Sequence, residues 1–262
     1  MVKKPFDKYI AYEIFVQEPT FEIQFLNKVY SKLRKGRQPL SLREDFCGTG
    51  YFCSEWVKQS EKHTAVGIDL DLEPIESGRE RHVKRLTERQ KKRLKYLNAD
   101  VTHAKIKADI VIAYNFSFWF FQERRELLRY FRSVRKSMKR DSLYVLDTMG
   151  GSEVVEVARE ESKWRGMKYI WECERFNPIT HRGYFSIHFK EKGERLRKRV
   201  FTYDWRYWTL PEVRDVLEEA GFRKTIVYWE GDNKRGGGDG IFRPQEKVED
   251  CSTWIVYLVC IP

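Results

Sequence analysis

The sequence predicts an α/β fold: a mostly parallel β-sheet flanked by helices, with an antiparallel β insert. Two observations lead to this fold class. Between residues 40 and 148, short apolar segments alternate with longer amphipathic ones, as in right-handed β-α-β crossovers. Between about 163 and 208, three long segments rich in aromatic and β-branched residues are separated only by turns, which is typical of antiparallel strands.

The sequence of residues 1–39 predicts a helical segment, here called the lead-in, that precedes the main domain. Two amphipathic stretches, 7–17 and 20–36, are separated by Pro19. Thr20 has the chemistry of a helix N-cap, and Gly36 marks the end of the second helix. We expect this segment to act as a lid, and residues 40–262 to form the main domain with its insert.

The main domain begins with five predicted strands and the helices between them. The strands are predicted at 40–46, 64–70, 93–101, 108–115 and 142–148, and the helices at 50–60, 73–90 and 122–140. The fourth strand is nearly all apolar, as expected of a strand buried on both faces.

The end of the chain predicts one more helix and two strands. The helix spans 210–222, and the strands span 224–231 and 253–261. A long glycine-rich loop joins the two strands. Its run at 236–240 lacks the Gly-Lys-Ser/Thr ending and the following helix of a phosphate-binding loop, so we predict a mobile turn there.

Composition limits the class of protein. A hydrophobic fraction of 41% with 15% aromatic residues excludes a disordered chain. The five cysteines have no zinc-site spacing, so we expect them to be reduced and mostly buried, and we expect no metal. The longest apolar stretch, 108–121, is too short to span a bilayer, which predicts a soluble, cytoplasmic protein without a membrane partner.

The net charge of +11 has two interpretations. It fits a nucleic-acid-binding surface, or basic residues that coat exposed helix faces. The basic segments 79–95 and 124–140 carry apolar residues at three- and four-residue spacing beneath the charge, which favours solvated helix faces. Nucleic acid is therefore an alternative partner that we do not favour.

The segment "LREDFCGTGYF", residues 42–52, is the first candidate site. Asp45 ends the first strand, Gly48 and Gly50 form a turn, and a helix follows. Glycine lets a ligand reach main-chain N–H groups, and the helix N-terminus adds partial positive charge. The third glycine of a dinucleotide-binding loop is missing, so a diphosphate does not fit this loop best.

Two further aspartates lie at the same predicted edge of the sheet. Asp69 ends the second strand, near the spacing at which an acid accepts hydrogen bonds from a ribose diol. Asp100 lies in the last residues of the third strand. Helix caps and loop acids explain each of them singly, whereas the trio with Asp45 favours a nucleotide-like ligand.

The motifs "DFCGTG", "VGIDLD", "NADV" and "DIVIAYN" resemble, in order and spacing, those of class I S-adenosylmethionine-dependent methyltransferases. The resemblance covers residues 40 to 150, and the final helix and strand pair resembles the end of that fold. It implies a Rossmann-like, seven-stranded, mostly parallel sheet with a reversed last strand. Cys47 departs from the pattern, because such families often have a small residue or glycine there.

The resemblance also implies roles for individual residues. The loop of Cys47, Gly48, Thr49 and Gly50 would pass under the methionine part of S-adenosylmethionine, with Asp45 near its amino group. Asp69 would bind the ribose hydroxyls, Leu70 and Val101 would pack by the adenine, and Asp100 would face its amino group. Asn115 would meet cofactor and substrate. Arg43 has two alternatives, a bond to the methionine carboxylate or a structural ion pair near Glu44. The cofactor contacts expected in this way are Arg43, Asp45, Cys47, Gly48, Thr49, Gly50, Asp69, Leu70, Asp100, Val101 and Asn115.

The acceptor is less well defined by the sequence. "FSFWFF" follows Asn115, without the proline pair of the "NPPY"-type motif of many enzymes that methylate DNA bases or protein amides. Aromatic residues crowd the predicted mouth of the site, where they fit either cation–π binding of a substrate or packing. These candidate substrate residues are Tyr9, Tyr12, Phe116, Trp119, Tyr207 and Trp208. The candidates for catalysis are Asn115, Tyr203 and Asp147, while His181 lies in a predicted hairpin turn.

We therefore expect a methyltransferase that transfers a methyl group from S-adenosylmethionine to N or O of a small-molecule acceptor, leaving S-adenosylhomocysteine. The sulfonium is already an activated electrophile, so the protein has to align the acceptor and exclude water. Two alternatives remain: a methyltransferase of RNA or of a protein, and a non-catalytic S-adenosylmethionine-binding protein on the same fold.

Overall fold

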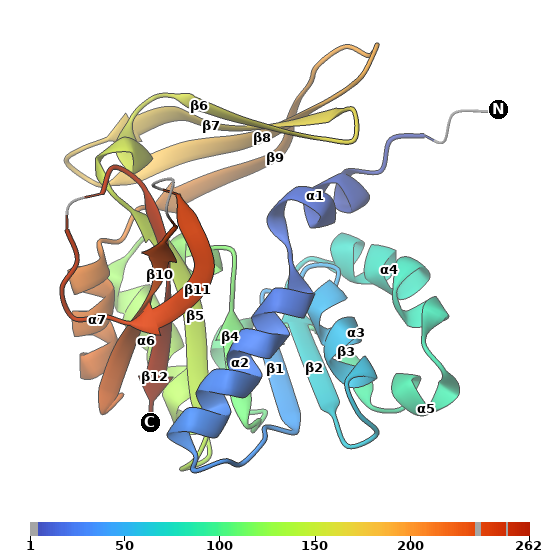
Figure 1. Cartoon of the computed structure of the whole chain (residues 1–262), viewed down its shortest axis with the longest axis vertical. Coiled ribbons are helices and arrows are strands. Elements are labelled where there is room, and N and C mark those ends of the chain that lie inside the picture. The colour runs from blue at the N-terminus through green and yellow to red at the C-terminus, as the bar shows by residue number, and fades with distance from the viewer. Residues whose placement is uncertain (1–4, 234–236, 250) are drawn as a thin grey trace.

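A computed structural model describes residues 5–233, 237–249 and 251–262, which form two β-sheets and seven α-helices in those residues (Figure 1). The larger sheet has the strand order β11-β10-β12-β5-β4-β1-β2-β3. Its strands are β1 (Ser41–Asp45), β2 (Thr64–Asp69), β3 (Leu94–Asn98), β4 (Ile110–Ala113), β5 (Leu143–Gly150), β10 (Lys224–Asp232), β11 (Gly238–Pro244) and β12 (Trp254–Ile261).

The larger sheet is parallel from β5 to β3. β1 pairs in parallel with β2 and β4, β2 with β3, and β4 with β5. β12 runs antiparallel to both β5 and β10, so the predicted mostly parallel sheet with a reversed last strand is confirmed.

One strand of this sheet was not predicted. The expected loop between the last two strands contains β11, which pairs antiparallel with β10 and adds an eighth strand at the edge. The predicted turn at 236–240 falls partly outside the described residues, because Gly236 is not among them. Gly238, Asp239 and Gly240 belong to β11 rather than to a loop.

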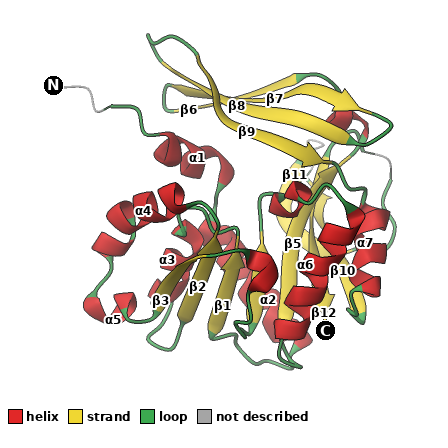
Figure 2. Ribbon diagram, turned by 180° about the vertical axis from the view of Figure 1, so that it is seen from behind, coloured by secondary structure: helices red, strands yellow, loops and turns green. Residues whose placement is uncertain are grey.

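Helices cover both faces of the larger sheet. The helices are α1 (Lys8–Val16), α2 (Pro19–Leu33), α3 (Tyr51–Lys58), α4 (Leu72–Arg81), α5 (Glu88–Lys91), α6 (Arg124–Ser137) and α7 (Leu210–Glu219). α2 and α3 bury apolar residues on one face, and α6 and α7 on the other (Figures 1 and 2). β4 contributes Ile110 and Ile112 to one core and Val111 and Ala113 to the other, as its apolar sequence predicts.

The antiparallel insert is confirmed as a separate four-stranded sheet of order β6-β7-β8-β9. Its strands are β6 (Arg159–Trp164), β7 (Met167–Asn177), β8 (Arg182–Glu191) and β9 (Arg197–Arg206). The sequence predicted three strands, and β6 was missed because its six residues are polar or exposed. The insert lies above the larger sheet next to α1 (Figure 1).

Two local predictions were wrong. The single helix expected at 73–90 ends at Arg81, because Thr87 starts a new helix with a capping box that includes Gln90. Thr20 is not an N-cap: α2 begins one residue earlier with Pro19 at its first position, after Glu18. No α-helix in the described parts of the chain has the length and apolar character needed to cross a lipid bilayer.

Candidate active site

The turn after β1 leaves open space above its backbone. Phe46, Gly48 and Gly50 all have positive φ values, of 58°, 52° and 62°. A Cβ atom on Gly50 would lie 2.2 Å from the ring of Tyr96, so glycine is required there. A Cβ atom on Gly48 would meet nothing within 4 Å, so this side of the turn is free to receive a ligand.

Asp69 ties the end of β2 to this turn. Its Oδ2 accepts a hydrogen bond from Gly48 N at 2.7 Å, and its Oδ1 accepts one from Asp71 N at 2.9 Å. Burial raises the pKa of the Asp69 carboxyl. Asp69 is thus held against the turn that contains Gly48.

A cleft of about 1050 Å³, here called the β2–β3 cleft, opens beside Asp69. Leu70, Asp100 and Val101 also line it, so the structure brings together four of the predicted cofactor residues. Leu70 is 69% exposed, which is unusual for a leucine and leaves an apolar surface in the cleft. Asp100 accepts a hydrogen bond from Thr102 N at 2.8 Å, which fixes the chain after β3.

Arg43 and Asp45 form a buried ion pair with each other. Arg43 Nε and Nη2 donate to the two oxygens of Asp45 at 2.7 and 2.9 Å, and Tyr130 of α6 donates to the same carboxylate. Arg43 Nη1 also donates to Ser137 of α6 at 2.9 Å. The structural alternative for Arg43 is therefore the one present here, and the expected contacts of Arg43 and Asp45 with a cofactor stay a prediction.

Glu44 is the acid on the opposite side of β1, and sequence reasoning missed it. Residues one apart on a strand face opposite sides, so Glu44 points towards α3 while its neighbours face α6. It accepts a hydrogen bond from Cys53 N, in the first turn of α3, at 3.2 Å. Burial raises the pKa of Glu44 to about 8. The alternation along "REDF" is the signal that would have found it.

Asp147 holds the turn that follows β4. Asn115 and Phe116 both adopt left-handed backbone angles, with φ of 59° and 56°, which is unfavourable for two consecutive non-glycine residues. Asp147 offsets this strain by accepting hydrogen bonds from both of their N–H groups, at 2.9 and 3.0 Å. Burial raises the pKa of Asp147 to about 7. The candidates Asn115 and Asp147 therefore lie in direct contact.

Two of the predicted aromatic residues come from α1. The rings of Tyr9 and Tyr12 pack on Phe201 of the insert, with centroids 6.0 and 5.1 Å apart. Tyr12 also shares a hydrogen bond with Tyr203, the third candidate for catalysis. Burial raises the pKa of Tyr203 well above its ordinary value, so its phenol stays protonated at neutral pH.

The other predicted aromatic residues lie deeper. Trp119 and Trp208 are 0% and 1% exposed. Trp119 packs on Phe116 and Tyr207, with centroids 5.6 and 5.3 Å apart, and Trp208 Nε1 donates to Phe121 O. The packing alternative thus accounts for Trp119 and Trp208. His181 lies between β7 and β8 with a φ of 55°, in the hairpin turn that the sequence predicts.

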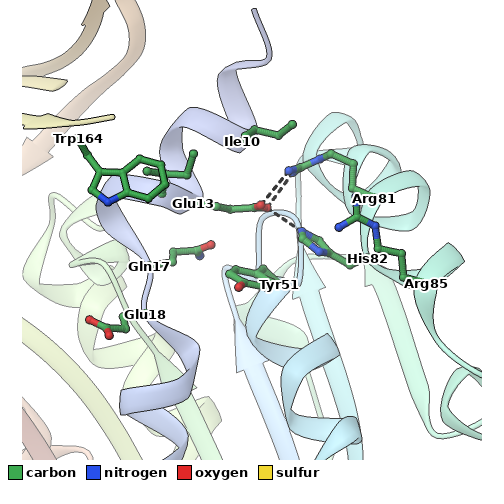
Figure 3. Close-up of a pocket in the computed structure, with 10 residues that line it drawn as sticks. Ile10, Glu13, Gln17, Glu18, Tyr51, Arg81, His82, Arg85 and Trp164 are labelled. Atoms are coloured by element: carbon green, nitrogen blue, oxygen red, sulfur yellow. Dashed lines mark hydrogen bonds and ion pairs between the residues drawn. The ribbon is translucent and has the colours of Figure 1, made fainter. Parts of the chain in front are cut away.

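Glu13 of α1 fastens the lead-in to the site (Figure 3). Its carboxylate accepts hydrogen bonds from Thr49 of the turn at 2.6 Å and from Arg81 of α4 at 2.8 Å, and His82 lies within 2.8 Å. Burial raises the pKa of Glu13, but the bonds from His82, Arg81 and Thr49 outweigh it and lower the pKa overall. A cavity of about 640 Å³ lies beside this cluster, and Trp164 of the insert closes one side of it.

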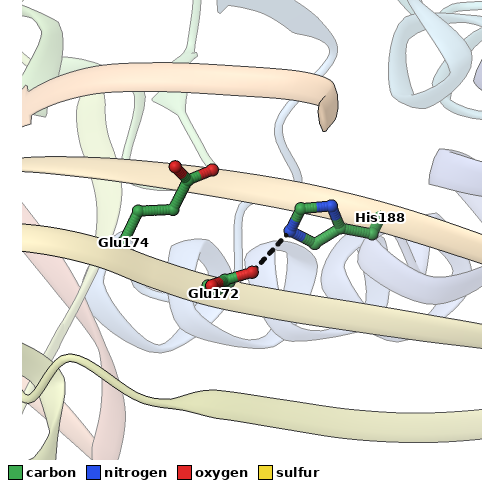
Figure 4. Close-up of side chains that lie close together, drawn as sticks. All are labelled: Glu172, Glu174 and His188. Carbon is green, nitrogen blue, oxygen red and sulfur yellow. Dashed lines mark ion pairs between the residues drawn. The ribbon is translucent and has the colours of Figure 1, made fainter. Parts of the chain in front are cut away.

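Among the described residues, one group of side chains has the spacing of metal ligands: Glu172, Glu174 and His188 of the insert (Figure 4). His188 Nδ1 accepts a hydrogen bond from Arg199 N, which leaves the proton of a neutral imidazole on Nε2, 2.9 Å from Glu172. Arg199 also donates to both oxygens of Glu174. Arg159 pairs with Glu172 in the same way, so both carboxylates already have an arginine partner, and we assign the cluster to the stability of the insert.

The comparisons with known proteins agree with this geometry. Residues 45–146 match the family model of a methyltransferase domain. No curated protein matches the sequence. Three similar solved structures are an S-adenosylmethionine-dependent methyltransferase from Clostridium acetobutylicum, DesVI from Streptomyces venezuelae, and CalS10, an amino pentose methyltransferase from Micromonospora echinaspora.

These structures match over almost their whole length. The Clostridium protein has a TM-score of 0.70 at 13% identity, covering 97% of this chain and 96% of its own. DesVI has a TM-score of 0.68 at 16% identity, covering 99% and 100%, and CalS10 has 0.65 at 13%, covering 100% of both chains. They share the fold with this chain. The fold is thus that of class I S-adenosylmethionine-dependent methyltransferases, and residues 45–146 match a methyltransferase domain.

Proposed function

We propose that this protein transfers the methyl group of S-adenosylmethionine to a nitrogen or oxygen atom of a small-molecule acceptor. The observation that carries the proposal is the continuous surface formed by the turn at Gly48, the Asp69 carboxylate and the β2–β3 cleft. This surface fits the cofactor in three ways: an uncovered backbone, an acid for a ribose diol, and an apolar wall at Leu70 for a base.

The residues divide the work of binding between them. The turn at Cys47–Gly50 would support the methionine part, Asp69 the ribose, and Leu70, Asp100 and Val101 the adenine. The bound cofactor supplies a methyl group on a positively charged sulfur, which needs no further activation. The protein would position the acceptor and exclude water, and α1 and the insert stand where they can cover the site.

A small acceptor is supported by the cover of the site and by the relatives. Tyr9 and Tyr12 of α1 contact Phe201 and Tyr203 of the insert, so these two elements are joined into one cover. CalS10 is described as an amino pentose methyltransferase, and a further structural relative, KedS8, as a sugar N-methyltransferase. Both descriptions support an acceptor of this size.

The test is calorimetric titration with S-adenosylmethionine and S-adenosylhomocysteine. We expect Asp69→Ala to weaken both by about tenfold or more, because a charged hydrogen-bond acceptor is lost. Asp215→Ala, an exposed acid of α7, is the matched control and should bind normally. Asp69→Ala with unchanged affinity and unchanged circular dichroism would rule the proposed cofactor site out.

A further inference from the structure

Three large apolar side chains are exposed at one cavity instead of being buried. The cavity of about 640 Å³ beside Glu13, here called the lid cavity, lies between α1, the end of α4 and the first hairpin of the insert. Ile10 and Ile14 of α1 and Trp164 of the insert line it, and they are 45%, 39% and 45% exposed. Exposed apolar side chains that gather in a concave site are typical of a ligand-binding surface.

The spacing of residues along α1 directs one side of the helix into the lid cavity. Ile10, Glu13 and Ile14 are three and four positions apart, so they share one side of α1, and all three line the cavity. A different side of α1 packs on the insert, where Phe15 stacks on Tyr169 with ring centroids 5.4 Å apart. The insert therefore covers that side of α1 and leaves Ile10 and Ile14 open to another partner.

Arg85 supplies a positive charge to the lid cavity. It ends the 3-10 turn Val83–Arg85 that follows α4, and Figure 3 shows it on the side of the cavity away from Trp164. Arg81, one turn earlier, donates from both terminal nitrogens to Glu13, whereas the Arg85 guanidinium forms no ion pair within the described chain. The Arg85 charge is therefore free to meet an anion from solution.

Gln17 and Glu18, which follow α1, limit the ligand further. Both line the lid cavity on the side away from Arg85 (Figure 3). Gln17 Oε1 is a buried atom without a hydrogen-bond partner among the described residues, so an N–H or O–H group of a ligand would complete it. Glu18 forms no ion pair in the part of the chain that the structure describes, and its charge repels a second negative group.

We propose that the lid cavity is a second ligand site, which binds a monocarboxylate with an apolar ring or chain. The carboxylate pairs with Arg85, and the apolar part lies on Ile10, Ile14 and Trp164. Among the described residues, none lines both the lid cavity and the β2–β3 cleft. This site is thus separate from the proposed cofactor site and goes beyond the proposed function.

Glu13 connects the lid cavity to the turn after β1. Its carboxylate lines the cavity and also accepts the hydrogen bond from Thr49 at 2.6 Å. A ligand that packs on Ile10 and Ile14 holds α1 in the position from which Glu13 reaches Thr49. Carboxylate and cofactor therefore each raise the affinity of the protein for the other by the same factor. This coupling is the part of the inference that rests on the proposed function.

The test is calorimetry with three probes that share an indole ring and differ in charge: indole-3-propionate, the uncharged indole-3-propionamide and the cation tryptamine. We expect indole-3-propionate to bind at least about tenfold more tightly than either of the others, because only its carboxylate forms a charged pair with Arg85. Equal binding of the three probes, tighter binding of tryptamine, or no binding of indole-3-propionate overturns the inference.

Three variants locate the site. Arg85→Gln should weaken indole-3-propionate by about tenfold or more and leave the amide unaffected, because it removes only the charge. Trp164→Ala should weaken both, because it removes a wall that contacts the shared ring. Arg79→Gln changes an exposed arginine of α4 outside the cavity, and should weaken neither. An unchanged affinity in Arg85→Gln, or the same loss in Arg79→Gln, contradicts the assignment.

A second titration separates this inference from the proposed function. Saturating indole-3-propionate should tighten the binding of S-adenosylhomocysteine by about fivefold or more, and Arg85→Gln should need about tenfold more probe for the same effect. An unchanged affinity for S-adenosylhomocysteine overturns the coupling. If the unmodified protein binds indole-3-propionate but not S-adenosylhomocysteine, the proposed function fails and the ligand site in the lid cavity stands.

Discussion

Three consecutive residues of β1 have different partners because a strand alternates its faces. Arg43 and Asp45 pair under α6, and Glu44 faces α3. The sequence alone led to Asp45 as a ligand-binding acid because it ends the predicted strand. The partner that decides its role, Tyr130, comes from α6, and a local motif does not contain it.

Asp45→Asn should destabilise the protein by about 3–5 kcal/mol, because it leaves the Arg43 guanidinium buried beside a neutral group. Urea unfolding at neutral pH measures this. Glu44→Gln is the matched control on the next residue, and we expect a loss of less than about 1 kcal/mol, since a carboxyl with a pKa of about 8 is mostly neutral there already. Equal losses in the two variants would contradict this assignment of charge.

The raised pKa values of Glu22, Glu44 and Asp147 predict how stability depends on pH. Each acid binds its proton more tightly in the folded protein than in the unfolded chain, where it titrates near its ordinary value. Their contribution is complete below the unfolded pKa and is lost as pH rises through the folded pKa of about 7 to 8. The free energy of unfolding, without cofactor, should therefore fall between about pH 5 and pH 8.

The same measurement on Glu22→Gln isolates one acid. Removing its titration should flatten the pH dependence by roughly 1–2 kcal/mol over that range. Urea melts at several pH values provide the slopes. A slope that is unchanged in the variant, or stability that rises with pH in the unmodified protein, would show that Glu22 titrates normally.

At the scale of elements, α4 and the turn after β1 pack so closely that no side chain fits between them. A Cβ atom on Gly78 would lie 1.8 Å from the carbonyl oxygen of Thr49. Gly78→Ala should therefore push α4 away from the turn, destabilise the protein by about 1–3 kcal/mol despite the better helix propensity of alanine, and weaken cofactor binding. Thermal melts and calorimetry measure both effects. Glu76→Ala, on the exposed side of α4, should change neither, and equal behaviour of the two variants would contradict this contact.

Strands and helices were predictable where one pattern continued over a whole element. β4 is apolar throughout and β5 begins with four apolar residues, and α7 begins with a capping box at Thr209 and ends before Gly221, which has a φ of 96°. β6 and β11 were not predictable in this way. Both are exposed strands at sheet edges, and they exist because a neighbouring strand offers hydrogen bonds, which local propensity does not report.

The same distinction holds for the site. The half that faces the β2–β3 cleft follows from short motifs, because Gly48, Asp69 and Asp100 each lie just after a strand of one sheet edge. The contacts of Glu22, Tyr114 and Tyr257 do not follow from a motif. These residues come from α2, the end of β4 and β12, and only the packing of α2 across the sheet brings them together.

At the scale of the whole molecule, the insert and the main domain share one core. Phe185 and Trp205 of the insert pack on Trp119, with ring centroids 6.3 and 5.8 Å away. We therefore expect a single cooperative unfolding transition, in which tryptophan fluorescence and far-UV circular dichroism change at the same temperature. Two separated transitions would mean that the insert unfolds on its own.

The insert carries much of the positive charge of the molecule. Between residues 159 and 206 it has 13 lysines and arginines against 7 aspartates and glutamates, in a chain whose net charge is +11.

The exposed Cys251 has a practical consequence. The other four cysteines are buried, so a maleimide dye should attach selectively to this one thiol. Its sulfur lies 2.9 Å from the carbonyl oxygen of Thr253, which lines a cleft of about 290 Å³ together with Trp171 of the insert. A fluorophore at this position would report when a compound enters that cleft. The native chain thus offers an optical assay for screening compounds without engineering a new attachment point.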